Sequence, residues 1–342
     1  PEEEPLNRVL RPERLNECIG SPEVMEKIRI AVAAARQRTE PLEHVLLHGP
    51  PGLGKTTLAH VIANEMGRKI RATSGPALRL PGDLMGVLTN LDRGDVLFID
   101  EIHRLPIAVE EFLYPAMEEF KVDFTVDSGP HARTINLPLK PFTLVGATTR
   151  AGLLSAPFLS RFGMTLHLDF WSEEELLERV RRSSDILRAE NEPAALRVIA
   201  QRSRGTPRIA NRLLRRVRDY AQVRGKGRLT VPIVEEALLL EGVDQLGLDE
   251  LDRKYLETLI RTYQGGPAGI EALAATLGEA RDTLEDVVEP FLLRRGLVAR
   301  TRQGRRATRA AYAHLGVAAP EPVAGEVQGP LFGDEEGDAA EQ

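Results

Sequence analysis

Between residues 42 and 145, short apolar runs alternate with longer stretches that have helical spacing. Uninterrupted apolar runs such as "HVLLHG", "DVLFIDE" and "FTLVGATT" are typical of strands that are buried on both faces of a parallel sheet. Between the first two runs, "TTLAHVIANEMG" repeats apolar residues at helical intervals and closes on a glycine. This alternation predicts an α/β domain with helices on both faces of a parallel sheet.

Residues 172 to 240 show helical patterning throughout. "SEEELLERVRRSSDIL" begins with a capping serine and places acidic residues in its first turn. "TPRIANRLLRRVRDYAQV" and "TVPIVEEALLL" follow, and glycine-rich turns separate them. We therefore expect a small domain made only of helices.

A third block begins near Asp249 with three short helical segments and ends in a basic stretch. In that stretch "GLVAR" and "RRAT" flank a Gln-Gly turn, which predicts a β-hairpin. Helices followed by a basic hairpin indicate a winged helix-turn-helix. From Ala319 on, Pro, Gly and acidic residues dominate, and we expect disorder. The expected division is a large ATPase domain (1–171), a helical lid (172–242), a winged-helix head (243–318) and an acidic tail (319–342).

The net charge of −6 conceals an uneven distribution. The tail carries seven acidic residues and no basic one, so the rest of the chain carries a small positive charge. Residues 294–309 contain seven arginines and no acid, which argues for a nucleic-acid partner. There is no apolar run of membrane-spanning length, the first residues are acidic, and Cys18 is the only cysteine. We expect a cytoplasmic protein with no membrane span, secretory signal, disulfide or cysteine-based zinc site.

The segment "GPPGLGKTT" (49–57) fits the phosphate-binding pattern G-x-x-x-x-G-K-[ST]. It follows a predicted strand and opens a predicted helix, which is the context that this motif requires. Glycines such as Gly52 and Gly54 let backbone N–H groups wrap the phosphates. We expect Lys55 to reach the β and γ oxygens of ATP and Thr56 to bind Mg²⁺.

Polar residues follow the next two predicted strands. "VLFIDE" ends in Asp100 and Glu101, which we place on the Mg²⁺ shell and near the attacking water, although acids after a strand are often solvated caps. "GATTR" offers two threonines, and we favour Thr149 as a contact of the γ-phosphate or the water; a capped turn is the alternative. Arg208 begins a helix of the lid, from which it could reach the γ-phosphate.

Together these residues resemble the AAA+ ATPase module. In that resemblance Arg161, within "LSRFG", corresponds to an arginine finger that points to the γ-phosphate bound by the neighbouring subunit. An arginine supplied in this way stabilises the charge of the transition state and makes hydrolysis depend on assembly.

Longer stretches are similar to the bacterial RuvB family, among them "LRPERLNECIG", "DVLFIDEIHRL", "GPHARTI" and "FTLVGATTRAGLLSAPFLSRFG". The resemblance runs from about Leu10 to Leu315. It implies an ATPase and branch-migration helicase that acts on Holliday junctions in recombination, DNA repair and the SOS response to DNA damage. It also implies a homohexamer around duplex DNA, with a RuvA tetramer at the junction and RuvC as partners.

The same resemblance assigns site residues. Its nucleotide contacts fall on Leu10, Arg11, Gly52, Gly54, Lys55, Thr56, Thr57, Glu118, Glu119, Phe120, Arg161, Trp171 and Arg208. Its wing contacts to DNA fall on Arg300, Arg302 and Arg305, and Arg302 is the candidate replacement for a family arginine at Gln303. A hairpin over about 122–139 carries Phe124 and Val126, which either dock on RuvA or pack on their own domain.

Other functions remain open. The chain could be a DNA-binding switch like the AAA+ replication initiators, or a clamp-loader subunit. The hairpin favours a motor, and the presence of every ATPase motif in one chain disfavours a clamp loader. In the tail, "QGPLF" resembles the peptide that binds sliding clamps through residues such as Gln328, Leu331 and Phe332, but short motifs also match by chance, and we favour chance.

Overall fold

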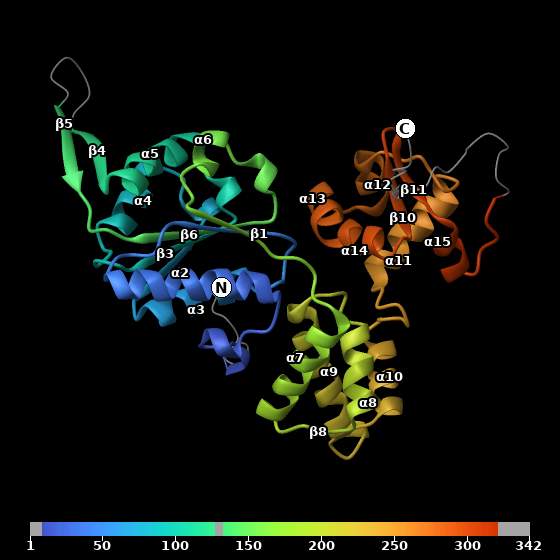
Figure 1. Cartoon of the computed structure of the whole chain (residues 1–342). Helices are drawn as coiled ribbons and strands as arrows, with labels where there is room; N and C mark the ends of the chain where they lie inside the picture. Colours follow the sequence, from blue (N-terminus) through green and yellow to red (C-terminus); the bar gives the residue numbers. More distant parts are fainter. Residues whose placement is uncertain (1–8, 127–132, 321–342) are drawn as a thin grey trace, which may run out of the picture.

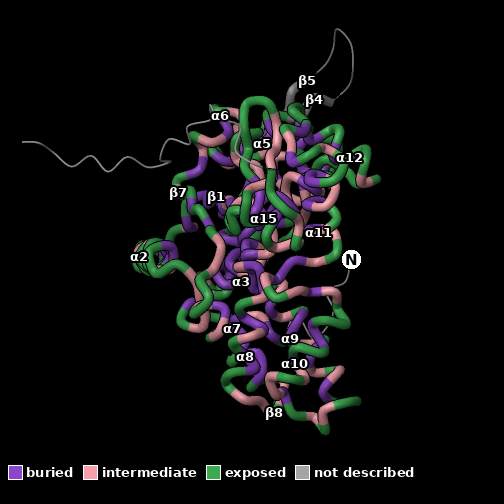
Figure 2. The backbone as a smooth tube through the Cα atoms, turned by 90° about the vertical axis from the view of Figure 1, so that its right-hand side faces the viewer, coloured by how far each residue is buried: buried purple, intermediate pink, exposed green. Residues whose placement is uncertain are grey.

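The computed structural model describes residues 9–126 and 133–320, without the side chains of 124–126 and 133–135. Figure 1 shows a large α/β body, a helical body beside it, and a smaller body that contains the last helices and a hairpin. Buried residues follow the inner strands of the sheet and the inner sides of the helices (Figure 2). None of the described helices combines the length and the apolar composition that a membrane span needs.

The large body is built on a sheet of five parallel strands in the order β2–β3–β6–β1–β7. The strands are β1 (Val45–His48), β2 (Ile70–Ser74), β3 (Val96–Asp100), β6 (Thr143–Thr148) and β7 (Met164–His167). Every residue of β6, the central strand, is buried. The apolar runs of the sequence are therefore parallel strands, and the predicted fold class is confirmed.

Helices cover both faces of this sheet. Val96 and Phe98 of β3 face the core beneath α2 (Pro22–Arg38) and α3 (Lys55–Met66), whereas Leu97 and Ile99 face the core beneath α4 (Pro81–Leu88) and α5 (Ile107–Glu118). Alternate residues of one strand thus enter opposite cores, as the pleat requires. The connecting segments are η1 (Leu15–Glu17), η2 (Gly75–Ala77), η3 (Ile102–Arg104), η4 (Ala151–Leu153) and α6 (Ala156–Leu159).

A separate antiparallel hairpin, β4 (Lys121–Val126) with β5 (Arg133–Pro138), extends from the large body (Figure 1). Phe124 pairs with Ile135 and Val126 with Arg133 through the backbone. The hairpin that the sequence suggested is present, while the side chains of Phe124 and Val126 lie outside the description. The clamp-like motif at Gln328, Leu331 and Phe332 also lies outside the described residues.

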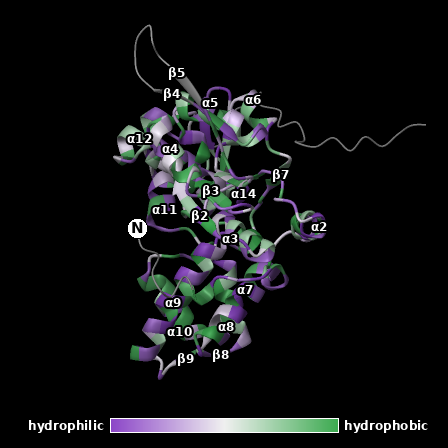
Figure 3. Ribbon diagram, turned by 90° about the vertical axis from the view of Figure 1, so that its left-hand side faces the viewer, coloured by the Kyte–Doolittle hydropathy of each residue, from purple (hydrophilic) through white to green (hydrophobic). Residues whose placement is uncertain are grey.

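The helical body consists of α7 (Glu173–Ile186), α8 (Pro193–Gln201), α9 (Pro207–Arg224) and α10 (Val231–Leu240), with the short strands β8 (Glu190–Asn191) and β9 (Arg228–Leu229). Ser172 caps α7: its Oγ accepts the N–H of Glu175, and the Glu175 carboxylate accepts the N–H of Ser172. These helices carry hydrophobic and hydrophilic residues side by side (Figure 3), and their apolar faces enclose one core. The predicted capping of α7 is present. The helical character holds for the four helices, but β8 and β9 also pair in parallel, which the sequence pattern did not predict.

The last body, which we call the head, contains three helices, a two-stranded wing and a short final helix. The first two helices are α11 (Glu250–Glu257), continued by the π-helical η5 (Thr258–Thr262), and α12 (Ile270–Leu277). The third runs without a break through α13 (Arg281–Thr283), the π-helical η6 (Leu284–Val288) and α14 (Glu289–Arg294). The wing is β10 (Val298–Thr301) and β11 (Gly304–Ala307), followed by α15 (Arg309–His314). Three helices with a hairpin wing form a winged helix, as predicted.

Candidate active site

The loop between β1 and α3 requires glycine at three of its positions. Gly49, Gly52 and Gly54 have φ values of 142°, 79° and 96°, which other residues rarely adopt. A Cβ at position 49 would lie 2.0 Å from the Leu168 carbonyl oxygen, and one at position 52 would lie 2.6 Å from Thr206 Cγ2. The loop therefore has the close-wrapped backbone that a phosphate-binding cradle needs.

Lys55 is buried at the start of α3. Its ammonium group donates to the carbonyl oxygens of Gly49 and Pro50, at 2.7 and 2.8 Å. Burial lowers the pKa of Lys55 to about 8, although the charges of Asp100 and Glu101 oppose this shift. The lysine, the glycine loop and the two acids thus share the carboxyl edge of the sheet.

Asp100 is the last residue of β3, and Glu101 follows it directly. Asp100 Oδ1 accepts the backbone N–H of Glu101 at 2.9 Å, and Glu101 accepts from Arg104 at 3.0 Å. Glu101 has a φ of 47°, a strained conformation that is found in functional sites more often than elsewhere. Thr56 and Asp100 offer a hydroxyl and a carboxylate oxygen, which suits Mg²⁺ that is shared with nucleotide phosphates.

Thr148, the last residue of β6, and Thr149, which follows it, have different surroundings. Thr148 is buried, its Oγ1 lies 2.9 Å from His103 Nδ1, and it accepts the N–H of Arg150 at 2.9 Å. Thr149 is half-buried, and within the described chain its hydroxyl makes no hydrogen bond. Because Thr148 is already engaged, this geometry supports Thr149 as the threonine that meets a ligand.

The helical body closes over the glycine loop. The Arg208 N–H, at the start of α9, points to the Gly52 carbonyl oxygen at 3.3 Å. A pocket lies between the two bodies, lined by Thr57 from α3, Trp171 from the segment that connects the bodies, and Arg179 from α7. Leu10 is buried nearby and its carbonyl accepts from Arg179 at 2.8 Å, which brings the N-terminal segment with Leu10 and Arg11 to this pocket.

Sequence reasoning missed Arg179 as part of this pocket. Burial lowers its pKa to about 10, with the charge of Arg182 acting in the same direction. A signal was present: Arg179 stands between Leu176 and Val180 on the buried face of α7, where an apolar residue is the norm.

Arg161 lies at the edge of the sheet formed by the amino ends of the strands, whereas Lys55 lies at the edge formed by their carboxyl ends. The glycine loop leaves the carboxyl end of β1, whereas Arg161 precedes the amino end of β7, and the two strands run parallel. Met164 N–H donates to the His44 carbonyl, so this turn lies beside the residues that open β1. A four-residue strand spans about 13 Å, which places Arg161 a strand length away from the phosphate loop of its own chain.

Glu118 and Phe120 accompany Arg161 at that edge. Arg161 Nε lies 3.3 Å from Glu118 Oε1, and its guanidinium covers the Tyr114 ring at 4.1 Å. Phe120 packs against the His44 ring, with 6.4 Å between the ring centroids. The expected nucleotide contacts therefore divide into two groups, one at each edge: Arg161 with Glu118, Glu119 and Phe120, and the group around Lys55.

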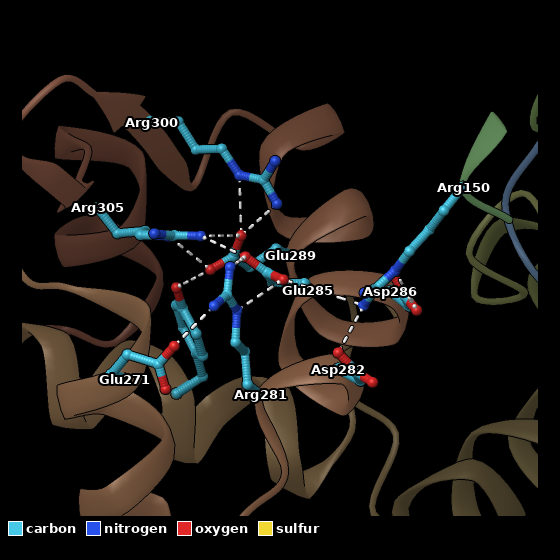
Figure 4. Close-up of polar contacts among 10 residues, drawn as sticks. Arg150, Glu271, Arg281, Asp282, Glu285, Asp286, Glu289, Arg300 and Arg305 are labelled. Carbon is cyan, nitrogen blue, oxygen red and sulfur yellow. Dashed lines mark hydrogen bonds and ion pairs between the residues drawn. The ribbon is translucent and has the colours of Figure 1, made fainter. Parts of the chain in front are cut away.

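The three wing arginines also differ. Glu289 is fully buried and accepts from Arg300 Nε at 2.8 Å, from Arg305 Nε at 2.9 Å and from the Tyr255 hydroxyl at 2.8 Å (Figure 4). Arg302 is exposed at the tip of the wing, and no described residue pairs with it. Of the three predicted DNA contacts, only Arg302 has no partner among the described residues. Arg300 and Arg305 also stabilise the head through their ion pairs with Glu289.

The glycine cradle, the acids at the end of β3, the lid and the winged head define an ATPase of the AAA+ class with a DNA-binding head. Family models agree: the RuvB P-loop domain matches residues 10–168, the RuvB AAA lid domain 171–244 and the RuvB C-terminal winged-helix domain 245–316. The chain belongs to the RuvB family.

Relatives and solved structures support this assignment. The chain is 60% identical, over 90% of both chains, to the Holliday junction branch migration complex subunit RuvB of Desulfosudis oleivorans. It is 56% identical, over 92% of both chains, to the same subunit of Kosmotoga olearia. The structure of the Thermotoga maritima RuvB Holliday junction branch migration motor superposes with a TM-score of 0.84 at 52% identity, covering 91% of this chain and all of that one.

Proposed function

We propose that the chain is the ATP-driven motor of Holliday-junction branch migration and works as a homohexamer. The observation that carries the proposal is the separation of Lys55 and Arg161 to opposite edges of one sheet. A single chain has each half of an ATPase site but cannot bring the halves together. Head-to-tail association joins the Lys55 edge of one copy to the Arg161 edge of the next, and repetition of one such contact closes a ring.

In the proposed mechanism, the glycine loop and Lys55 bind the phosphates, and Trp171 and Arg179 line the pocket for the rest of the nucleotide. Mg²⁺ supplies charge neutralisation when it is bound, and Thr56 and Asp100 would hold it. Glu101 orients and deprotonates the attacking water, and Thr149 positions it. Arg208 contacts the γ-phosphate and so links its presence to the position of the lid. Arg161 of the neighbouring copy stabilises the transition state.

DNA contact is assigned to the wing. Arg302 would bind backbone phosphates, which carry no sequence information, as a motor that accepts any sequence requires. RuvA is the proposed partner of the β4–β5 hairpin through Phe124 and Val126, and RuvC is the proposed nuclease partner. The division at 171, 242 and 318 and the cytoplasmic location stay predictions. The contact of the tail with a sliding clamp stays the alternative to a chance match of the motif.

A synthetic four-way junction with one fluorescent arm tests the proposal. Together with RuvA and ATP, the chain should convert the junction into two duplexes, and the variant Glu101→Gln, which keeps the glycine loop, should not. The alternative is a DNA-binding switch that uses ATP only to assemble. DNA-dependent assembly with ATP, combined with intact junctions in the presence of RuvA, would favour the switch.

A further inference from the structure

The side chain of Arg150 reaches from the ATPase domain to the head and binds it. It directly follows Thr149, and its Nε donates to both carboxylate oxygens of Asp286, at 2.9 and 3.1 Å. Its Nη2 donates to Asp282 at 2.9 Å, and Glu285 lies 4.0 Å away (Figure 4). All three acids belong to the third helix of the head, which we call the acidic helix (281–294).

The contacts continue from the acidic helix to the wing. Glu285 accepts from Arg305 at 3.2 Å, and Arg305 binds the buried Glu289 together with Arg300 (Figure 4). Burial would raise the pKa of Glu285, but hydrogen bonds from Arg281 and the charges of Arg281, Arg305 and Arg150 lower it, so this carboxylate stays ionised. One row of alternating charges thus links the end of β6 with both strands of the wing.

The same residue is tied to the ATPase site. The Arg150 N–H donates to the Thr148 hydroxyl, and that hydroxyl lies 2.9 Å from His103. His103 stands two residues after Glu101, in the turn that holds the strained Glu101 backbone. A movement of the turn or of the end of β6 therefore changes the position from which Arg150 reaches the head.

A second arginine connects the head to the lid, and it differs from Arg150. Arg204 is 6% exposed and pairs with Asp249 and with Asp252, which is fully buried. Arg150 and Asp286 are 26% and 29% exposed. Breaking a buried pair leaves an uncompensated charge, whereas water can replace a partner in the half-exposed pair. The ion pairs of Arg204 with Asp249 and Asp252 should therefore persist, whereas the ion pair of Arg150 with Asp286 can break and re-form.

We infer that Arg150 is a positioning residue that holds the acidic helix to the end of β6 and so couples nucleotide turnover to the position of the wing. The acidic helix occupies the place from which winged helices usually read DNA. Its solvent-accessible acids Asp282 and Asp286 would repel phosphates, and their contact with Arg150 gives that surface another use. The inference rests on the proposed function, because coupling to DNA has a purpose only in a motor.

The first test compares Arg150→Gln with a control on the same helix, Arg281→Gln. Arg281 pairs with Glu271 and Glu285 but makes its contacts within the head. Both variants should bind a fluorescent ATP analogue and duplex DNA within about twofold of the parent chain. Only Arg150→Gln should lose the stimulation of ATPase by duplex DNA, by about tenfold. The charge exchange Arg150→Glu with Asp286→Arg should recover most of the stimulation.

The second test follows the position of the head directly. Cysteines replace the exposed Glu111 and Ala313 in a Cys18→Ser background, and a donor and an acceptor dye report the distance from the ATPase domain to the head. The distance should differ between ADP and a non-hydrolysable ATP analogue in the parent and not in Arg150→Gln. This readout is independent of branch migration.

Specific outcomes would overturn the inference. The inference fails if Arg150→Gln keeps its full DNA stimulation of ATPase or binds nucleotide more weakly. It also fails if Arg281→Gln loses the stimulation equally, or if the response of the dye distance to nucleotide is the same in Arg150→Gln as in the parent. A parent chain without DNA-stimulated ATPase would instead contradict the proposed motor, and the distance measurement alone would then decide on Arg150.

Discussion

Two buried ionisable side chains stand near the two ends of β1. His44, just before the strand, accepts the Leu144 N–H with Nδ1 at 2.9 Å, and its Nε2 lies 3.0 Å from the Met117 carbonyl. This pattern requires a neutral ring with its proton on Nε2. Lys55, beyond the other end, is charged below a pKa of about 8. The two ends of β1 thus carry a buried, hydrogen-bonded histidine and a lysine that we expect to bind phosphate.

Nucleotide binding should weaken at alkaline pH. Lys55 loses its proton as the pH rises through about 8, and the neutral amine cannot attract phosphates. The affinity for a fluorescent ATP analogue, measured by anisotropy, should fall several-fold between about pH 7.5 and pH 9. Adenosine, which has no phosphates, is the control and should be insensitive; an equally flat profile for the ATP analogue would contradict the role of Lys55.

Stability should fall at mildly acidic pH, in part because of His44. Burial lowers its pKa in the folded protein below the usual 6.5. The unfolded chain therefore binds the proton more readily, and stability is lost as the pH falls below 6.5. A neutral variant, His44→Gln, should show a shallower decline, by up to about 1.4 kcal/mol per pH unit. Denaturant unfolding at several pH values would measure it, and equal slopes would refute the assignment.

At the scale of elements, the wing combines a predicted DNA-binding surface with a structural contact. Arg302 projects at its tip, whereas Arg305 and Arg300 neutralise the buried Glu289 beneath it. The acidic helix is joined to the wing by the same carboxylate. The wing therefore cannot move relative to the acidic helix without exposing a buried charge.

Substitutions in the wing should separate these roles. Arg302→Ala should reduce the salt slope of duplex binding by about 0.9, alike across DNA sequences, without changing the melting temperature. Arg305→Ala should in addition destabilise the head by about 2 kcal/mol, because Glu289 loses a charged partner. Filter binding at several salt concentrations and calorimetry would measure the two effects. A strong sequence dependence for Arg302→Ala would contradict phosphate contact.

At the scale of the whole molecule, the two groups of predicted nucleotide contacts lead us to expect that catalysis requires assembly. The Lys55 group and the Arg161 group lie at opposite edges of a rigid five-stranded sheet. No change of side-chain conformation brings them together within one chain. ATP hydrolysis should therefore require the interface between two copies of the chain.

Mixed rings provide the decisive measurement. Arg161→Ala and Glu101→Gln should each bind ATP and fail to hydrolyse it. Mixing them should restore part of the ATPase rate, because an intact Glu101 in one copy then meets an intact Arg161 in its neighbour. Background activity in mixtures whose co-assembly is verified by labelled subunits would show that Arg161 does not act across the interface.

Local sequence patterns were sufficient for the parts of this protein that form within a few residues. The glycine loop, the acids after β3 and the capping box at Ser172 each depend on short-range geometry, so their positions follow from neighbours in the chain. The apolar runs likewise predicted parallel strands, since burial on both faces leaves no polar alternation.

Tertiary packing decided how these pieces meet. The order of the strands placed Arg161 away from Lys55, and Arg150 found its partners 132 and 136 residues further along the chain. The arginines of the wing looked equivalent in sequence, yet a buried glutamate engages two of them and leaves Arg302 at the tip. Such contacts depend on which surfaces the three bodies bury against one another. Two charges far apart in the sequence interact strongly only when folding brings them together in a region of low dielectric constant.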